Sequence, residues 1–321
     1  MYPGKYAEQN PDRSAFVMAA TGERVSYQEF EARSNRVAHY LADKGLGFQD
    51  HYSIFMENNN RYLESCAAGE RSGLYFTCIN SFLTSDELAY IINNSESQIL
   101  ITSMSKLEAA QEALAQCTAI KEVLVVGAGD ADLPEGMSDF ASTLSKYPET
   151  PLERELLGAA MLYSSGTTGR PKGIVRPLPE QSPNEPLPVI GFLSGLWRYR
   201  EDMIYLSPAP LYHSAPQAAV GLTLRMGGTV VIMERFDPAD YLRFVEEYQV
   251  SHSQLVPTMF SRMLKMPEED RTKYDLSSLE VAVHAAAPCP VLVKQQMIDW
   301  WGPIIHEYYG ATEGLGFAAC D

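Results

Sequence analysis

Three stretches of the chain carry apolar residues at helical spacing, and each stretch follows a residue that can cap a helix. Ser26 with Glu29, and Thr84 with Glu87, have the spacing of a capping box. Asp237 comes directly before a proline, as in a helix that has an N-cap residue and then proline at its first position. We therefore expect three amphipathic helices, whose buried positions are Tyr27, Phe30, Val37, Tyr40 and Leu41, then Leu88, Ile91 and Ile92, and finally Tyr241, Phe244, Val245 and Tyr248.

Short apolar runs lie between these helices, and Gly, Ser or charged residues bound each run. Strands that alternate with helices predict mainly parallel sheets that are covered by helices on both faces. The expected strands cover residues 99–101, 123–126, 229–233 and 279–283.

The length of 321 residues predicts two packed α/β subdomains, because one sheet would be large for such a chain. Residues 127–138 are rich in Gly, Asp and Pro, and residues 177–188 contain five prolines. We expect the first segment to separate subdomains and the second to be an exposed excursion. We place the subdomains at residues 1–158 and 159–321.

The composition of the chain argues against several classes of protein. The formal net charge is −16, from 25 Lys and Arg against 41 Asp and Glu, which argues against a nucleic-acid surface. The five cysteines form no CxxC pair, which indicates reduced thiols and a cytoplasmic location. The N-terminus lacks the apolar region of a signal peptide. Residues 203–224 carry no formal charge but contain three prolines, so we expect buried core there and no transmembrane segment.

Residues 163–173 have the composition of a polyphosphate-binding loop. Glycines let backbone N–H groups approach an anion, hydroxyls donate further hydrogen bonds, and a lysine adds charge. A flexible surface loop is the alternative, but the apolar run 159–163 leads straight into this segment, as a buried strand leads into a phosphate site. The order differs from a Walker P-loop, since glycine follows the lysine. The candidate phosphate ligands are Ser164, Ser165, Gly166, Thr167, Thr168, Gly169 and Lys172.

Residues 307–314 contain the residue types that could bind other parts of a nucleotide. An aromatic ring can stack on adenine, a glycine permits a tight turn, a threonine hydroxyl can bond the α-phosphate, and a carboxylate can hold Mg²⁺. A strand end followed by a turn would explain only the glycine. The candidate nucleotide and metal ligands are Tyr308, Tyr309, Gly310, Thr312 and Glu313.

These two segments resemble the phosphate loop and the YGxTE motif of the adenylate-forming superfamily, which contains acyl-CoA synthetases, luciferases and peptide-synthetase adenylation domains. Residues 210–216 (PLYHSAP), 254–260 (QLVPTMF) and 283–288 (VHAAAP) are similar to further segments of that superfamily, in the same order. Many members have glycine where this chain has His284 or Ala285. The chain is identified as a member, similar to the AMP-forming acyl-CoA synthetases.

The resemblance implies the layered α/β/α/β/α N-terminal domain of these enzymes, with mainly parallel sheets and with the C-terminal part missing. Tyr309 would stack on adenine against the backbone of Ala286 and Ala287. Thr312 would orient the α-phosphate, and Glu313 would ligate Mg²⁺. The acyl tail would lie near Tyr212, His213, Val256, Met259, Phe260 and Ala311.

The implied activity has two half-reactions. A carboxylate attacks the α-phosphate of ATP to give acyl-AMP and pyrophosphate, and the CoA thiolate then attacks the acyl carbon and releases AMP. His213 would border the carboxylate, which makes His213, Thr312 and Glu313 the candidate catalytic residues. The implied partners are a carboxylic acid, ATP with Mg²⁺, and CoA, and the sequence leaves a homodimer open.

The matching segments are closer to fatty-acyl and aryl-CoA ligases than to peptide synthetases, so we expect a fatty or other apolar acid. Two alternatives stay open, namely an aryl-acid or amino-acid adenylating enzyme and a nucleotide- or acyl-binding fragment without catalysis. In the family, a ribose-binding Asp, a hinge and a C-terminal lysine follow the YGxTE motif, and none of them lies before Asp321. We expect the 321-residue chain alone to form little or no acyl-CoA.

Overall fold

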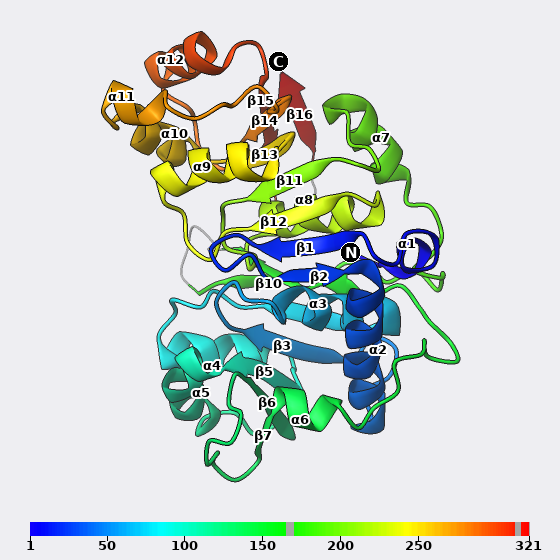
Figure 1. Cartoon of the computed structure of the whole chain (residues 1–321). Coiled ribbons are helices and arrows are strands. Elements are labelled where there is room, and N and C mark those ends of the chain that lie inside the picture. The colour runs from blue at the N-terminus through cyan, green and yellow to red at the C-terminus, as the bar shows by residue number, and fades with distance from the viewer. Residues whose placement is uncertain (165–169, 312–315, 321) are drawn as a thin grey trace. The chain divides into compact units, whose positions relative to one another are not determined.

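The computed structural model describes residues 1–164, 170–311 and 316–320, which form two compact units. Unit 1 comprises residues 1–13, 26–185 and 211–214, and unit 2 comprises residues 14–25, 186–210 and 215–321. Parallel pairing joins most neighbouring strands in the main sheet of each unit (Figure 1). The predicted mixed α/β fold with mainly parallel sheets is therefore confirmed.

Unit 1 is built on a six-stranded sheet with the order β7-β6-β5-β3-β4-β8, and a separate two-stranded sheet joins β9 and β10. Its strands are β3 (His51–Phe55), β4 (Tyr75–Cys78), β5 (Ile99–Ser103), β6 (Glu122–Val126), β7 (Met137–Asp139), β8 (Ala159–Ala160), β9 (Leu162–Ser164) and β10 (Lys172–Ile174). Its helices are α1 (Gly4–Gln9), α2 (Tyr27–Asp43), α3 (Tyr62–Ser72), α4 (Ser85–Asn94), η1 (Met104–Lys106), α5 (Leu107–Leu114) and α6 (Phe140–Leu144).

Helices cover both faces of the unit 1 sheet, as alternation along β3 shows. Phe55 packs into a core with residues of α4 and α5, including Leu88 and Ala110. On the other face, the hydroxyl of Tyr52 donates a hydrogen bond to the backbone carbonyl of Ser65 in α3. Four of the five residues of β3 are buried, as expected for a parallel strand that is covered on both faces.

The predicted starts of α2 and α4 are confirmed, because both helices begin with a complete capping box. The Ser26 hydroxyl accepts from the Glu29 N–H, and Thr84 does the same for the Glu87 N–H. In each case the glutamate side chain accepts from the N-cap N–H in return. Each capping box therefore satisfies two backbone N–H groups at a helix start.

A buried arginine joins three distant segments of unit 1. The side chain of Arg71 is fully buried, with Nη2 at 2.6 Å from Glu31 Oε2 and Nε at 2.9 Å from Glu155 Oε1. Its guanidinium also lies over the ring of Tyr2, whose hydroxyl donates to Glu155 Oε2 at 2.7 Å. Burial raises the pKa of the Glu155 carboxyl, although the Arg71 charge acts in the opposite direction. No periodicity in the sequence indicates this network.

Replacing Arg71 should lower the free energy of unfolding far more than replacing an exposed arginine. Arg71→Met leaves the carboxylates of Glu31 and Glu155, whose side chains are only 15% and 13% exposed, without a cation, so we expect the free energy of unfolding to fall by about 3–5 kcal/mol. The control is Arg154→Met, whose pair with Glu180 is 72% exposed on each side and should contribute less than about 1 kcal/mol. Urea denaturation of both variants at pH 7 measures the difference, and equal effects would contradict the assigned role.

Unit 2 is built on an eight-stranded sheet with the order β16-β15-β14-β13-β11-β12-β1-β2. Its strands are β1 (Ser14–Met18), β2 (Arg24–Ser26), β11 (Ile204–Ser207), β12 (Thr229–Ile232), β13 (His252–Leu255), β14 (Val281–His284), β15 (Ile305–Gly310) and β16 (Phe317–Cys320). Its helices are α7 (Pro188–Trp197), α8 (Ser214–Arg225), α9 (Pro238–Tyr248), α10 (Pro257–Leu264), α11 (Glu268–Arg271) and α12 (Val291–Trp301).

A hydrophobic core of unit 2 lies where α9, α10 and α12 gather beside the sheet (Figure 1). Tyr241 and Phe244 of α9 and Phe260 of α10 are buried there with Ala282 of β14. The Asp237 side chain caps α9 by accepting from two backbone N–H groups, as predicted.

Three segments are placed differently from the sequence-based expectation. The prediction that residues 127–138 separate subdomains is wrong, because β7 pairs with β6 and the segment is a loop within one sheet. Residues 14–25 belong to unit 2, since β1 pairs in parallel with β12. Residues 159–185 belong to unit 1, where β8 pairs with β4. None of the helices in the described part of the chain has both the length and the hydropathy of a transmembrane span.

One buried histidine makes unit 2 sensitive to pH. His252 is 1% exposed, and its Nε2 lies 3.0 Å from the backbone carbonyl of Trp197. A carbonyl only accepts, so Nε2 carries the proton, and Nδ1 lies 2.8 Å from the Ser251 hydroxyl. Burial lowers the pKa of His252 to about 4. The folded protein therefore holds this ring neutral where an unfolded histidine begins to charge.

The stability of the protein should fall on acidification through this histidine. Below pH ~6.5, His252 takes up a proton in the unfolded chain, whereas in the folded protein it does so only near pH 4. The neutral ring therefore contributes about 3 kcal/mol to the free energy of unfolding at neutral pH, and this contribution is lost as the pH falls from about 6.5 to about 4. We expect wild type to lose more stability than His252→Gln between pH 7 and pH 4.5, measured by urea denaturation. His39→Gln, at a partly exposed position, serves as the control. Parallel pH profiles for wild type and His252→Gln would contradict the assignment.

Candidate functional site

In unit 1, the predicted phosphate loop lies on the hairpin of β9 and β10. The strands are antiparallel, and their register places Ser164 directly opposite Lys172. A hydroxyl and an exposed lysine therefore flank the two ends of the loop. The remaining candidates of this loop, Ser165, Gly166, Thr167, Thr168 and Gly169, lie outside the described residues.

The segment with Tyr212 and His213 also belongs to unit 1. It is anchored where the Leu211 N–H donates to Asn58 Oδ1 at 2.9 Å. The rings of Tyr212 and His213 lie 4.3 Å apart between centroids, directly before α8. His213 is exposed overall, yet the protein atoms around its ring lower its pKa, which favours the neutral imidazole at neutral pH.

In unit 2, the candidate residues lie at or just after the carboxyl ends of three adjacent parallel strands. The register aligns Leu255 of β13 with His284 of β14 and Glu307 of β15. The chain leaves β13 at Val256 and β14 at Ala285, next to the end of β15. Parallel α/β sheets bind ligands at this edge.

The two tyrosines of β15 differ in what they can do. Tyr308 is tied into the fold, because its hydroxyl accepts from Gln254 Nε2 at 2.8 Å and its ring stacks on Phe317 at 5.1 Å. Tyr309, on the opposite face of the strand, is 79% exposed. Of the two, Tyr309 is therefore the ring that is free to stack on a ligand. Gly310 ends the strand and Ala311 follows it in an exposed position.

A strained alanine lies beside this edge. Ala286 has φ of 73°, in the left-handed region that residues other than glycine rarely adopt. Ala286 and Ala287 are exposed, whereas Ala285 is buried. The left-handed turn presents the small residues 286–287 to solvent at the end of β14. Strain of this kind is concentrated at functional sites.

The residues predicted to line the acyl pocket have unequal exposure. Val256 is partly exposed, Met259 is 8% exposed, and Phe260 is fully buried. Phe260 makes edge contacts with the rings of His284 and Trp301. These contacts give Phe260 a packing role in the core, and its contact with an acyl chain stays a prediction.

Sequence reasoning missed a charged cluster at the same edge. Glu307 Oε2 lies 2.8 Å from Lys294 Nζ and 3.7 Å from His284 Nε2. The hydrogen bond from Lys294 lowers the pKa of Glu307, and burial lowers that of His284. Lys294 lies on α12, 13 residues before Glu307 in the sequence, and no local pattern joins the two.

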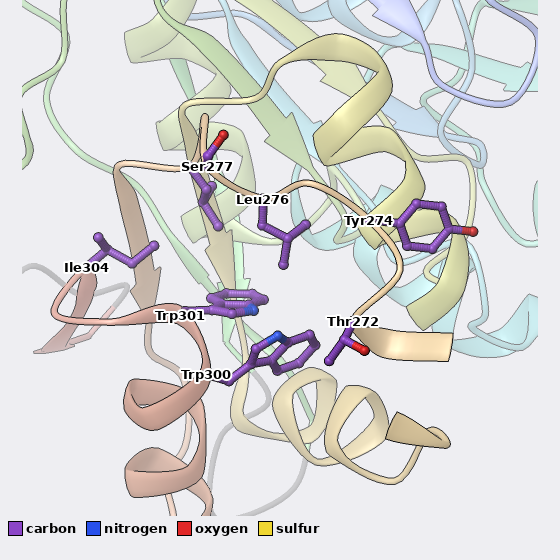
Figure 2. Close-up of a pocket in the computed structure, with 8 residues that line it drawn as sticks. Thr272, Tyr274, Leu276, Ser277, Trp300, Trp301 and Ile304 are labelled. Carbon is purple, nitrogen blue, oxygen red and sulfur yellow. The ribbon is translucent and has the colours of Figure 1, made fainter. Parts of the chain in front are cut away.

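A hollow of about 280 Å³ lies at the opposite edge of this sheet (Figure 2). In Figure 2 the indoles of Trp300 and Trp301 lie on one side of it, and Leu276 and Tyr274 lie on the other. Its lining is aromatic, aliphatic and hydroxyl-bearing, without a charged side chain. Since Leu279 and Ile304 precede β14 and β15, the hollow is at the amino-terminal ends of the strands, and we do not place the phosphates of a nucleotide there.

The candidate metal ligand Glu313 and its neighbour Thr312 lie outside the described residues. Within residues 1–164, 170–311 and 316–320, no group of three or more His, Cys, Asp or Glu side chains could hold a metal ion. Mg²⁺ commonly uses one or two carboxylates together with substrate phosphates, so a preformed protein cage is not required.

The fold defines a class, namely α/β proteins with mainly parallel sheets, and several candidate ligand-binding residues of this chain lie at or near the carboxyl ends of parallel strands. Residues 5–321 match the model of the AMP-binding enzymes, and the chain belongs to that family. The expected resemblance to the adenylate-forming enzymes is thereby confirmed.

Among curated relatives, the chain is 28% identical over 282 residues to 4-coumarate–CoA ligase 1 of Petroselinum crispum, covering 86% of this chain and 50% of the relative. It is 27% identical over 291 residues to medium/long-chain-fatty-acid–CoA ligase FadD8 of Mycobacterium tuberculosis, covering 87% and 49%. The chain thus spans about half the length of these relatives. The structure of ATP-bound MatB from Rhodopseudomonas palustris matches with a TM-score of 0.76 at 26% identity, covering 98% of this chain and 60% of MatB.

The strained backbone at Ala286 predicts that replacing this residue by glycine stabilises the protein. A left-handed backbone costs alanine about 1–2 kcal/mol, and glycine at the same position would be free of this strain. Part of that stabilisation is offset, because glycine also has more conformational freedom in the unfolded chain. Ala286→Gly should therefore raise the free energy of unfolding by about 0.5–1 kcal/mol. Ala285→Gly, one residue earlier with ordinary φ, should lower it by a similar amount. Urea denaturation tests both, and destabilisation by Ala286→Gly would show that the turn is not strained.

Proposed function

We propose that this chain provides the nucleotide- and acid-binding part of an enzyme that activates a carboxylic acid with ATP and transfers the acyl group to CoA. The observation that carries the proposal is the glycine- and hydroxyl-rich segment held between Ser164 and Lys172 on one hairpin, in a chain of the AMP-binding family. The relatives whose names state an activity are acid–CoA ligases.

Lys172 and Ser164 suit the polyphosphate of ATP. Adenylation brings a carboxylate to phosphorus, so two anions must approach each other, and catalysis depends on positioning and charge neutralisation. Lys172 is exposed and, among the described residues, forms no salt bridge. Its ammonium is therefore available to the β- and γ-phosphates, together with the hydroxyls and N–H groups of Ser165 to Gly169.

Tyr309 and the turn after β14 suit the adenine base. An exposed tyrosine ring supplies a stacking face, and the exposed backbone of Ala286 and Ala287 has no bulky side chain to block a flat base. Tyr308 would support this arrangement from the opposite face of β15, where Gln254 and Phe317 hold it.

His213 suits a position beside the reacting carboxylate. Its lowered pKa keeps the imidazole neutral at pH 7, so it can donate a hydrogen bond to a carboxylate without forming a tight ion pair. Thr312 would bond the α-phosphate, and Mg²⁺ would be held by phosphate oxygens and Glu313, where it would neutralise the charge that builds up on the transferred group.

We propose an apolar acid as the substrate, most simply a fatty acid. The residues assigned to the acyl tail are mainly apolar, namely Val256, Met259, Phe260 and Ala311 with Tyr212 and His213. An aryl acid is the second candidate, since 4-coumarate–CoA ligases are among the relatives. Competition between a medium-chain fatty acid and 4-coumarate, measured on the full-length enzyme as acyl-AMP formed, separates these two substrates.

Calorimetric titration with MgATP tests the proposed nucleotide site. We expect saturable binding by this chain, weakened about 10- to 100-fold in Lys172→Ala, because a charged hydrogen bond to phosphate is lost. Glu313→Gln should weaken MgATP but leave metal-free AMP unaffected. Lys146→Ala, at another exposed lysine, is the matched control. Equal affinity in wild type and Lys172→Ala would refute the assignment of the loop.

A further inference from the structure

Two side chains on α4 hold the two stems of the phosphate-loop hairpin. Asn94 Oδ1 accepts from the hydroxyl of Tyr163, which precedes the loop, at 2.7 Å. The Tyr90 hydroxyl donates to the backbone carbonyl of Pro171, which follows the loop, at 3.1 Å. The Arg170 guanidinium also lies over the Tyr90 ring, 5.0 Å from its centroid. Both stems of the hairpin are thus bound to one helix.

The hairpin needs such anchors, because its own ladder is short. The strands β9 and β10 pair over three residues each and form a sheet of their own within unit 1. An isolated two-stranded hairpin is marginally stable at best. Contacts outside the ladder must therefore fix where Ser164 and Lys172 lie.

The helix α4 is a firm support for these contacts. A capping box closes its first turn, and Leu88, Ala89, Ile91 and Ile92 bury its apolar face in the core of unit 1. Residues four apart share one face of a helix, so Tyr90 and Asn94 project side by side. Their spacing matches the two stems of the hairpin.

We propose that Tyr90 and Asn94 are positioning residues for ATP, which set the distance between the two ends of the phosphate loop. The inference rests on the proposed function, because it assumes that this loop holds the β- and γ-phosphates. Neither residue needs to touch the nucleotide. Loosening either stem would reduce the affinity for a triphosphate and leave the affinity for a monophosphate unchanged.

The test compares binding of MgATP and AMP by calorimetry in Tyr90→Phe and Asn94→Ala. Each change removes one hydrogen bond to one stem, and we expect MgATP to bind about 3- to 10-fold more weakly while AMP binds as before. Tyr248→Phe removes a similar bond, from a tyrosine hydroxyl to the Ala19 carbonyl, in unit 2. Asn93→Ala removes a bond from α4 to the Gln116 carbonyl. These two control variants should leave both affinities unchanged.

Hydrogen exchange of the peptide covering residues 161–174 provides a second readout that needs no nucleotide. We expect faster exchange in Tyr90→Phe and Asn94→Ala than in wild type or the two controls. Unchanged exchange, unchanged MgATP affinity, or an equal loss for MgATP and AMP would each overturn the inference. Failure of wild type itself to bind MgATP would instead refute the proposed function, and the exchange rates would then decide whether α4 anchors the hairpin.

Discussion

In-register parallel pairing is the constraint on which the candidate residues of unit 2 depend. The pairing of β13, β14 and β15 aligns Leu255, His284 and Glu307, so the three strands release the chain at the same edge. A slip of one residue in β15 would exchange the faces of Tyr308 and Tyr309. The bond from Gln254 to the Tyr308 hydroxyl then could not form, and the exposed ring would be buried. Register therefore decides which tyrosine is presented to a ligand.

In unit 1, a buried charge and a short hairpin are linked along the chain. Arg71 holds Glu155, and only a few residues later β8 joins the main sheet beside β4. The chain then enters β9 and the segment assigned to phosphate. The arginine thus fixes where the approach to the hairpin starts, and α4 fixes where its stems lie. Buried ion pairs can favour one conformation of the chain over others, although they lower stability relative to apolar packing. The ion pair of Arg71 is consistent with such a role for the segment that leads to the hairpin.

Local patterns in the sequence predicted many of the helices and strands, but they could not predict which distant segments pair with each other. Capping residues such as Ser26 and Thr84 act within one turn, so the starts of α2 and α4 could be located without tertiary information. The insertion of β1 beside β12 joins residues more than 200 positions apart, and no local pattern indicates it. For the same reason, the sequence did not predict the Lys294–Glu307 ion pair or the contacts of Tyr90. Phe260 shows a different limit, because an apolar residue on an amphipathic helix has the same appearance in the sequence whether it lines a pocket or packs in a core.

The side chains of His284 and Ala285, where many family members have glycine, are accommodated without crowding the turn that follows. His284 is fully buried, between the ring of Phe260 and the Glu307 carboxylate, and its imidazole points into the core. Ala285 is buried as well, so neither side chain occupies the exposed surface of Ala286 and Ala287. The departure from the family pattern therefore changes the packing behind the strand end, while the surface assigned to adenine keeps small residues. A larger residue at 286 would place its side chain on that surface, and a β-branched one would also strain the left-handed backbone further.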